Sequence, residues 1–131
     1  MRVADEIKAH FDKNKNHQFG DVPASTIVKW AESCKFKERQ LTPTQMRRFY
    51  DAIRGVWDDP KMKNMADGDK LEEMFLARLI FLRPAFAGAV RKNKIPPAFK
   101  EIMDQSIQKV KKKKDMYKFV KFFEAIIQYA E

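Results

Sequence analysis

Two arginines share one side of a segment that the sequence predicts to be helical. Arg47 and Arg54 are seven residues apart, so a helix turning 100° per residue places both on one stripe beside its apolar face. Asp51 lies close to this stripe, four residues after Arg47, and Tyr50 lies at the edge. Two interpretations stay open. The stripe is either a solvated flank with an Arg47–Asp51 pair, or a row of guanidinium groups that binds phosphates while Tyr50 stacks on a base or sugar.

Other basic residues complete the predicted binding surface. Four of them surround Pro84 and the segment after it: Arg83, Arg91, Lys92 and Lys94. Arg48 points away from the Arg47 stripe but belongs to the same predicted helix. We therefore predict nucleic-acid contacts at Arg47, Arg48, Tyr50, Arg54, Arg83, Arg91, Lys92 and Lys94. The run Lys111–Lys114 is less specific, because lysines between helices most often form a solvated linker.

Arg78 is a candidate for a different role. Helical spacing places it between Leu71 and Met74, inside an apolar face. Burial of an unpaired guanidinium is costly, so we expect Arg78 to be paired, to reach solvent, or to lie in an interface with another chain. The segment 70–82 around it is apolar almost all round, which predicts the buried centre of a bundle or a helix covered by a second copy.

The sequence contains no set of residues for catalysis. His10 and His17 are separated by a predicted loop, and the single Cys34 cannot complete a zinc site with them. There is no phosphate-binding glycine loop, and no nucleophile with a partner base can be assembled. We expect no enzyme activity, no metal and no cofactor.

The positive charge is concentrated in one part of the chain. The 131 residues carry a net charge of +9, and residues 83–121 alone hold twelve basic and three acidic side chains. Such a block predicts a nucleic-acid partner, an anionic membrane surface, or solubility alone. The membrane interpretation is disfavoured because a chain this small needs its apolar helix faces for the core. The lone cysteine and the absence of an apolar leader favour a cytoplasmic protein with no membrane partner.

Helical periodicity dominates the chain, and strict alternation of apolar and polar residues does not persist. The clearest helix start is Thr42-Pro43, with Gln45 placed to complete a capping box. We predict an all-α fold: a small bundle of five or six helices without a sheet, forming one domain over residues 1–131. Residues 1–22 are expected to be a loosely packed N-terminal segment. The sequence does not define the order of residues 12–22 and 58–68.

Two segments resemble a known family. The stretch Leu41–Tyr50, LTPTQMRRFY, resembles the "L-T-T-S-Q-I-R-K-F-Y" signature of the small α-helical subunit of type III-A CRISPR interference complexes, the Csm complexes. The stretch 82–91, LRPAFAGAVR, is similar to the family's "L-K-P-K-L-A-Y-x-x-x-R". Ala85 stands where the family usually has Lys, and Gly88 where it has an aromatic residue. The resemblance covers roughly residues 25–130.

The resemblance implies a non-catalytic subunit for antiviral defence in a prokaryotic cytoplasm. Several copies would line up along the crRNA and target RNA and contact the RNA backbone without sequence preference. They would pack against RAMP-type backbone subunits, the large palm-domain subunit and copies of themselves, and the RNA cutting would belong to the partners.

Two other classes of protein stay open. A small helical DNA-binding regulator would use the Thr42 helix as its recognition helix. A helical adaptor without a nucleic-acid role would carry the basic residues for solubility alone. Salt-dependent binding of RNA compared with duplex DNA separates the three.

Overall fold

The structure is a computed structural model and describes residues 2–131. Within this range the chain forms eight α-helices and one 3-10 turn, η1, at Phe19–Asp21. The helices are α1 (Val3–Lys13), α2 (Ala24–Cys34), α3 (Pro43–Trp57), α4 (Pro60–Lys63), α5 (Glu73–Ile80), α6 (Leu82–Arg91), α7 (Pro97–Gln108) and α8 (Lys113–Tyr129). The predicted all-α class is confirmed, whereas five or six helices is too few. The short helix α4 was not predicted; Asp59 accepts a hydrogen bond from the Lys61 N–H at its start, and Pro60 takes its first position.

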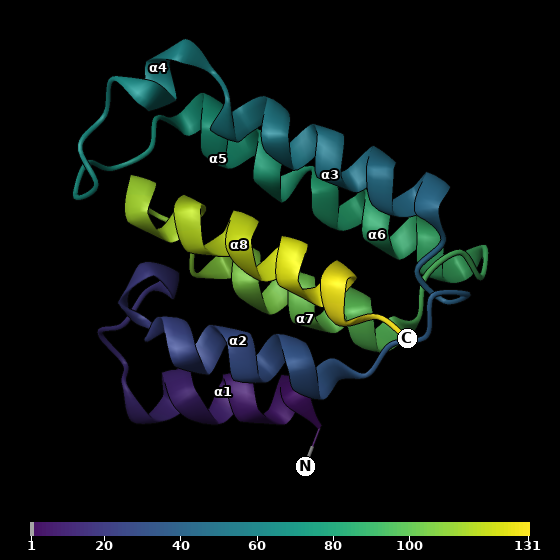
Figure 1. Cartoon of the computed structure of the whole chain (residues 1–131). Helices are drawn as coiled ribbons and strands as arrows, with labels where there is room; N and C mark the ends of the chain where they lie inside the picture. Colours follow the sequence, from purple (N-terminus) through teal and green to yellow (C-terminus); the bar gives the residue numbers. More distant parts are fainter. Residues whose placement is uncertain (1) are drawn as a thin grey trace.

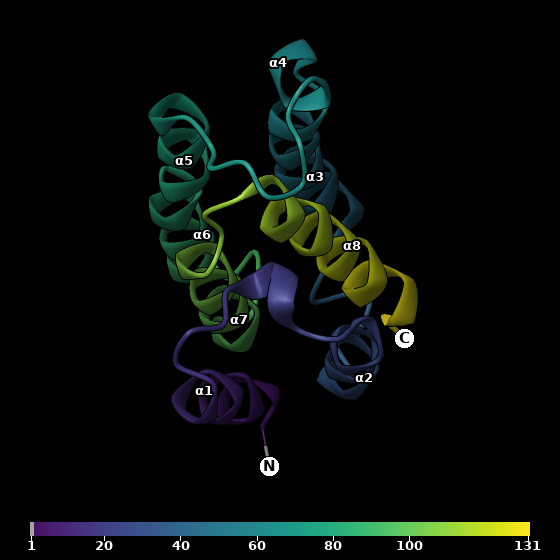
Figure 2. The ribbon, with the colours of Figure 1, turned by 90° about the vertical axis from the view of Figure 1, so that its left-hand side faces the viewer.

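The helices are arranged in two layers of similar direction (Figure 1). One layer contains α3, α8 and α2, and the other contains the consecutive helices α5 and α6 followed by α7 and α1. Figure 2 shows the layers on opposite sides of the molecule, with α5 and α6 facing α3 across one edge. None of the helices within residues 2–131 is long and apolar enough to cross a membrane.

Phenylalanines fill the space between the layers. Seven of them are fully buried: Phe19, Phe75, Phe86, Phe99, Phe119, Phe122 and Phe123. Phe86 of α6 packs edge-to-face on Phe49 of α3 and on Phe99 of α7, with ring centroids 4.7 and 6.1 Å apart. Phe122 of α8 belongs to this buried set. It is buried because Trp30 of α2 and Phe19 of η1 cover that side of the helix.

The N-terminal segment contributes to this core. Val3, Ile7 and Phe11 are buried on one side of α1, which packs on α7 and α2. Phe19 and Val22 are buried beyond it, although we expected loose packing here. The apolar spacing of α1, at i and i+4, explains why the helix docks instead of extending from the bundle.

Helix α3 begins where the sequence predicts, but the capping box is absent. Thr42 is the N-cap residue and Pro43 occupies the first helical position, yet the Thr42 side chain makes no cap hydrogen bond. The prediction of a capping box with Gln45 is therefore wrong. The fixed backbone angle of Pro43 suits a first turn without that bond.

Helix α5 lies at the edge of the bundle and not at its centre. It buries Phe75 and Leu79, whereas Met74 and Ile80 are exposed. The helix stops at Ile80, and Phe81 forms the turn into α6. Pro84 lies in the first turn of α6, where a proline is tolerated, and the break between the two helices falls before it, at Phe81.

Candidate nucleic-acid interface

The Arg47–Arg54 stripe exists on α3, but the two guanidinium groups differ in how strongly they are paired with carboxylates of this chain. Arg47 has an 85% exposed side chain and only a long contact of 3.9 Å to Asp51. Arg54 places two nitrogens on the two oxygens of Asp58, at 3.2 and 2.8 Å. A guanidinium held in a bidentate pair has fewer donors left for a phosphate. The structure therefore leaves Arg47 available and engages Arg54 within the protein.

Tyr50 is also engaged. Its hydroxyl donates a 2.8 Å hydrogen bond to Glu124 of α8, which raises the pKa of the phenol. Its ring lies almost parallel to that of Phe123, with an interplanar angle of 16°. The half-buried ring thus joins α3 to α8, and base stacking would require it to leave both contacts.

Arg83 belongs to a small charge cluster between α6 and α7. Its Nε lies 3.3 Å from Asp104, and Lys100 approaches the same carboxylate at 2.6 Å. Asp104 is buried, so these two cations provide the compensation that a buried carboxylate needs. Arg83 is half-buried, and its contact with Asp104 leaves it less available for a phosphate.

Four predicted residues are exposed and unengaged. One of them, Arg48, lies on α3. The other three lie at the end of α6 and directly after it: Arg91, Lys92 and Lys94. None of the four makes an ion pair or a side-chain hydrogen bond with another described residue. The Phe49–Phe86 contact places α3 beside α6, and Figure 1 shows the start of α3 and the end of α6 at the same end of the bundle. The fold thus brings Arg48 to the same end as the cluster around residues 91–94.

Arg78 is exposed and lies beside α3. A Cβ added at Gly55 would be 3.0 Å from its Nη2, so the guanidinium rests against that glycine. No carboxylate pairs with it among residues 2–131. Gly55 is two helical turns from Arg48, or about 10 Å along the axis, and occupies the same side of α3. We call this set the α3–α6 cationic face: Arg48, Arg78, Arg91, Lys92 and Lys94.

Three small residues lie on the helices that carry these cations. Ala52 of α3 and Ala85 of α6 are exposed, and a Cβ at Gly88 would meet nothing within 4 Å. Small side chains let a polyanion approach the backbone while the longer cations reach it from the sides. The two departures from the family motif, at 85 and 88, are therefore both small residues on α6.

The Lys111–Lys114 run is not the solvated linker that we expected. Lys114 pairs with Asp21 at 2.8 Å, and the Lys113 ammonium donates to the Met65 carbonyl. The backbone N–H groups of Lys111 and Lys112 donate to Asp115. These contacts hold the run in place and reduce its capacity for phosphates.

The described residues contain no group of three or more His, Cys, Asp or Glu side chains that could hold a metal ion. His10 and His17 nevertheless meet, with Nε2 and Nδ1 at 3.2 Å, because the chain folds back after α1. Spacing in the sequence did not reveal this contact.

The fold and the site define an all-α basic protein with an exposed cationic face. The family model described as Csm2 Type III-A matches residues 21–131. The chain therefore belongs to this family and is a Csm subunit of a type III-A CRISPR complex. No curated protein and no solved structure matches the chain significantly.

Proposed function

We propose that the protein is a non-catalytic RNA-binding subunit of its complex, acting in antiviral defence in the prokaryotic cytoplasm. Its α3–α6 cationic face would lie along phosphates of the crRNA and target RNA. The observation that carries the proposal is a set of five exposed cations on α3, on α5 and at the end of α6, none of which has a carboxylate partner among the described residues. Elsewhere Arg54, Arg83 and Lys114 are neutralised by Asp58, Asp104 and Asp21.

Contacts of this kind do not depend on base sequence. Lysine and arginine neutralise phosphates, whereas reading of bases requires donors and acceptors held against base edges. Tyr50, the aromatic residue we expected to stack on a base, is bound to Glu124 instead. A subunit that binds crRNA and target RNA of any sequence needs contacts of this kind.

Membership in a type III-A CRISPR complex supports the partners that the resemblance implies. We propose RAMP-type backbone subunits and the large palm-domain subunit as neighbours, with several copies of this chain along the RNA. Cutting of RNA would be done by the partners, as the resemblance implies.

Binding of the isolated protein to labelled single-stranded RNA tests the proposal. We expect weak affinity, similar for RNAs of unrelated sequence, that falls as salt rises by roughly 0.7 in log–log slope for each phosphate contact. Salt-independent binding would contradict the proposal. Tighter binding to one duplex DNA sequence would favour the DNA-binding regulator, and no binding to either would favour the adaptor.

A further inference from the structure

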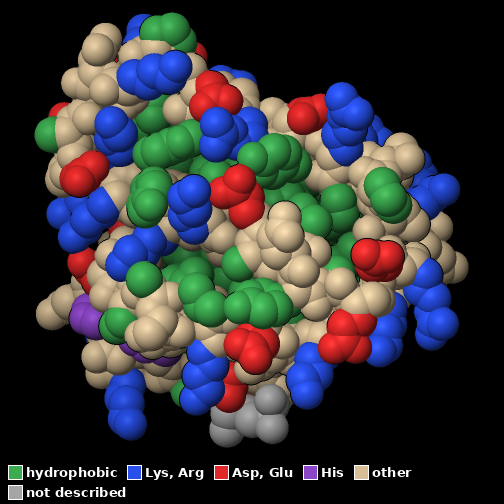
Figure 3. Space-filling model, in the orientation of Figure 1, with side chains coloured by type: hydrophobic (Ala, Val, Ile, Leu, Met, Phe, Trp, Pro, Cys, Tyr) green, Lys and Arg blue, Asp and Glu red, His purple; other side chains and the backbone are tan. Residues whose placement is uncertain are grey.

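The two histidines of the chain meet where the backbone turns back after α1. Nε2 of His10 and Nδ1 of His17 are 3.2 Å apart, and the ring centroids are 5.3 Å apart. Figure 3 shows histidine side chains at the surface on one side of the molecule, so solvent reaches the pair. Two neutral imidazoles can present nitrogen lone pairs to a single ligand here.

The surrounding contacts fix His17 relative to His10. The Asn14 side chain donates a 2.8 Å hydrogen bond to the His10 carbonyl, and the His17 N–H donates a 2.9 Å hydrogen bond to the Asn14 carbonyl. The His10 ring lies edge-on against Phe11 and Trp30, at centroid distances of 5.1 and 5.6 Å. The pair is therefore arranged in the folded chain before a ligand binds, which lowers the entropic cost of binding.

The separation of the two nitrogens matches the span of two ligands on one metal ion. Two metal–nitrogen bonds of about 2.0–2.1 Å that meet at about 100–110° place their nitrogens about 3.1–3.4 Å apart. The metal lies beside the line that joins the nitrogens, so both rings rotate about their side-chain bonds to aim at it. The ring that donates the hydrogen bond in the metal-free pair then carries its proton on its other nitrogen, and no proton has to leave the protein.

The hollow beside His10 contains a carboxylate without an ion pair. It lies between α1 and α2, and its lining includes Glu6, Lys13, Lys29 and Trp30. Oε2 of Glu6 is buried without a hydrogen-bond partner. An unpaired carboxylate favours a cation nearby, whereas the two lysines are exposed and extend their ammonium groups into solvent.

From this geometry we infer that His10 and His17 form a binding site for a divalent transition-metal ion such as Zn²⁺. Imidazole nitrogens suit Zn²⁺, Ni²⁺ and Cu²⁺, whereas Mg²⁺ and Ca²⁺ prefer oxygen ligands. No third His, Cys, Asp or Glu side chain completes a metal-binding group with the pair among residues 2–131, so water fills the remaining positions. The bound ion joins α1 to the turn before η1. The inference does not rest on RNA binding, because the pair lies outside the α3–α6 cationic face.

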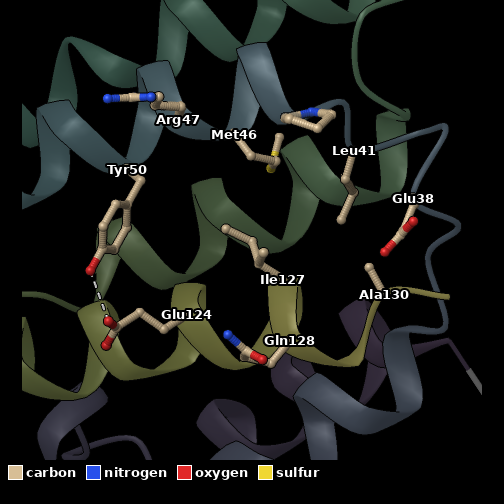
Figure 4. A pocket seen from close by; sticks show the side chains of 10 residues that line it. Glu38, Leu41, Met46, Arg47, Tyr50, Glu124, Ile127, Gln128 and Ala130 are labelled. Atoms are coloured by element: carbon tan, nitrogen blue, oxygen red, sulfur yellow. Dashed lines mark hydrogen bonds between the residues drawn. The ribbon is translucent and has the colours of Figure 1, made fainter.

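Neither the carboxylates of the α3–α8 groove nor the thiol of the chain offers a competing site. In this groove Glu38 and Glu124 lie apart, with apolar side chains between them (Figure 4). Glu124 already accepts the 2.8 Å hydrogen bond of the Tyr50 hydroxyl. The Sγ of Cys34 donates to the Trp30 carbonyl at 3.2 Å and is not part of the histidine pair. We therefore expect one metal ion per chain.

Isothermal titration calorimetry of the tag-free, RNA-free protein with ZnCl₂ is the first test. We expect one equivalent of Zn²⁺ to bind, and no binding when MgCl₂ replaces ZnCl₂. His10→Gln and His17→Gln each remove one of the two protein ligands and should weaken binding by at least about tenfold. Cys34→Ser is the matched control and should bind like the wild type. Equal affinity in the wild type and in the two histidine variants, or loss of binding in Cys34→Ser, would overturn the inference.

Electron paramagnetic resonance of the protein with one equivalent of CuSO₄ counts the nitrogen ligands directly. Cu²⁺ binds nitrogen sites more tightly than Zn²⁺, and its spectrum should show two imidazole nitrogens in the wild type and one in each single variant. A spectrum that is the same in the wild type and both variants would overturn the inference.

Thermal melting shows whether the ion binds the folded chain. ZnCl₂ should raise the melting temperature of the wild type, EDTA should reverse the rise, and His17→Gln should show no rise. His17 lies in the turn, so its replacement leaves the packing of His10 on Trp30 in place even if His10→Gln unfolds. An equal rise in the wild type and His17→Gln would overturn the inference. RNA is absent throughout, so failure here is distinguishable from failure of the proposed function.

Discussion

The backbone N–H of Gly20 donates a 2.6 Å hydrogen bond to Oδ1 of Asp115, which joins η1 to the start of α8 across 95 residues of sequence. The other oxygen of Asp115 accepts the N–H groups of Lys111 and Lys112. Asp115 is fully buried, and its carboxylate satisfies three donors that would otherwise have no partner there. One side chain thus fixes the first turn of α8 and the segment that covers it.

We predict that Asp115→Ala destabilises the protein by about 3 kcal/mol or more. The substitution leaves three backbone donors without their acceptor, and each buried unsatisfied group costs about 1–3 kcal/mol. Urea unfolding followed by circular dichroism measures the change. A loss below about 1 kcal/mol would show that water replaces the carboxylate and that the anchor is not needed.

Alanine substitutions at two glycines are expected to have opposite effects. A Cβ at Gly20 would lie 2.6 Å from Asp115 Oδ1 and 2.9 Å from the Asp115 backbone nitrogen, so Gly20→Ala must displace the anchor and destabilise the fold. Gly88 lies inside α6 with a negative φ and open space around it. Gly88→Ala should raise the free energy of unfolding by about 0.5–1 kcal/mol. The same urea experiment measures the free energy of unfolding of both variants. A change in the same direction for Gly20→Ala and Gly88→Ala would be inconsistent with the described packing.

Acid should weaken the fold through His10. Burial, and secondly the charge of His17, lower the pKa of His10 below its ordinary value of 6.5. The unfolded chain therefore takes up this proton at higher pH than the folded chain, and stability falls as pH drops below about 6.5. In His10→Gln the decline below about pH 6.5 should be smaller than in the wild type. Parallel curves for the two proteins would refute this role.

Cys34 is expected to react slowly in the folded protein. Burial, assisted by the charge of Glu6, raises the pKa of its thiol to about 12, and the Sγ donates to the Trp30 carbonyl. Because the thiolate is the reactive form, alkylation by iodoacetamide near pH 8 should be at least about a hundredfold slower than in urea. Comparable rates in the two conditions would contradict the protected environment. By the same linkage, stability should fall as pH rises above 9, the ordinary value for this thiol.

Sequence patterns predicted the helices that carry strong local signals. Pro43 and the apolar spacing after it placed α3, and Pro97 occupies the corresponding first position of α7. The predicted number of helices was too low, and the short helix α4 is one that the pattern did not indicate. The capping box was wrong because a suitable residue at the right spacing does not ensure that the hydrogen bond forms.

The binding site could be predicted only in part. A helical wheel shows on which side of its helix a residue lies, but it does not show which residues of other segments contact it. It placed Arg47 and Arg54 on one stripe, yet Asp58 holds Arg54. The partner of Tyr50 is Glu124, 74 residues away, which no spacing within α3 could indicate. Arg48 was placed away from the stripe, and only the packing of α3 beside α6 shows what it faces.

The measurement that tests the proposed function most directly is the salt dependence of RNA binding by charge-matched variants. Arg48→Ala with Arg91→Ala removes two exposed cations from the α3–α6 cationic face. Lys8→Ala with Lys29→Ala removes the same charge from α1 and α2, where both lysines are exposed. Neither pair should change the melting temperature appreciably, since exposed side chains away from special contacts contribute little to stability.

We expect the Arg48/Arg91 variant to bind single-stranded RNA more weakly and with a log–log salt slope smaller by roughly 1.4, corresponding to two lost phosphate contacts. The Lys8/Lys29 variant should keep the wild-type slope. Equal losses in both variants would mean that binding follows net charge alone, and an unchanged slope in the Arg48/Arg91 variant would contradict the assignment of RNA to this face.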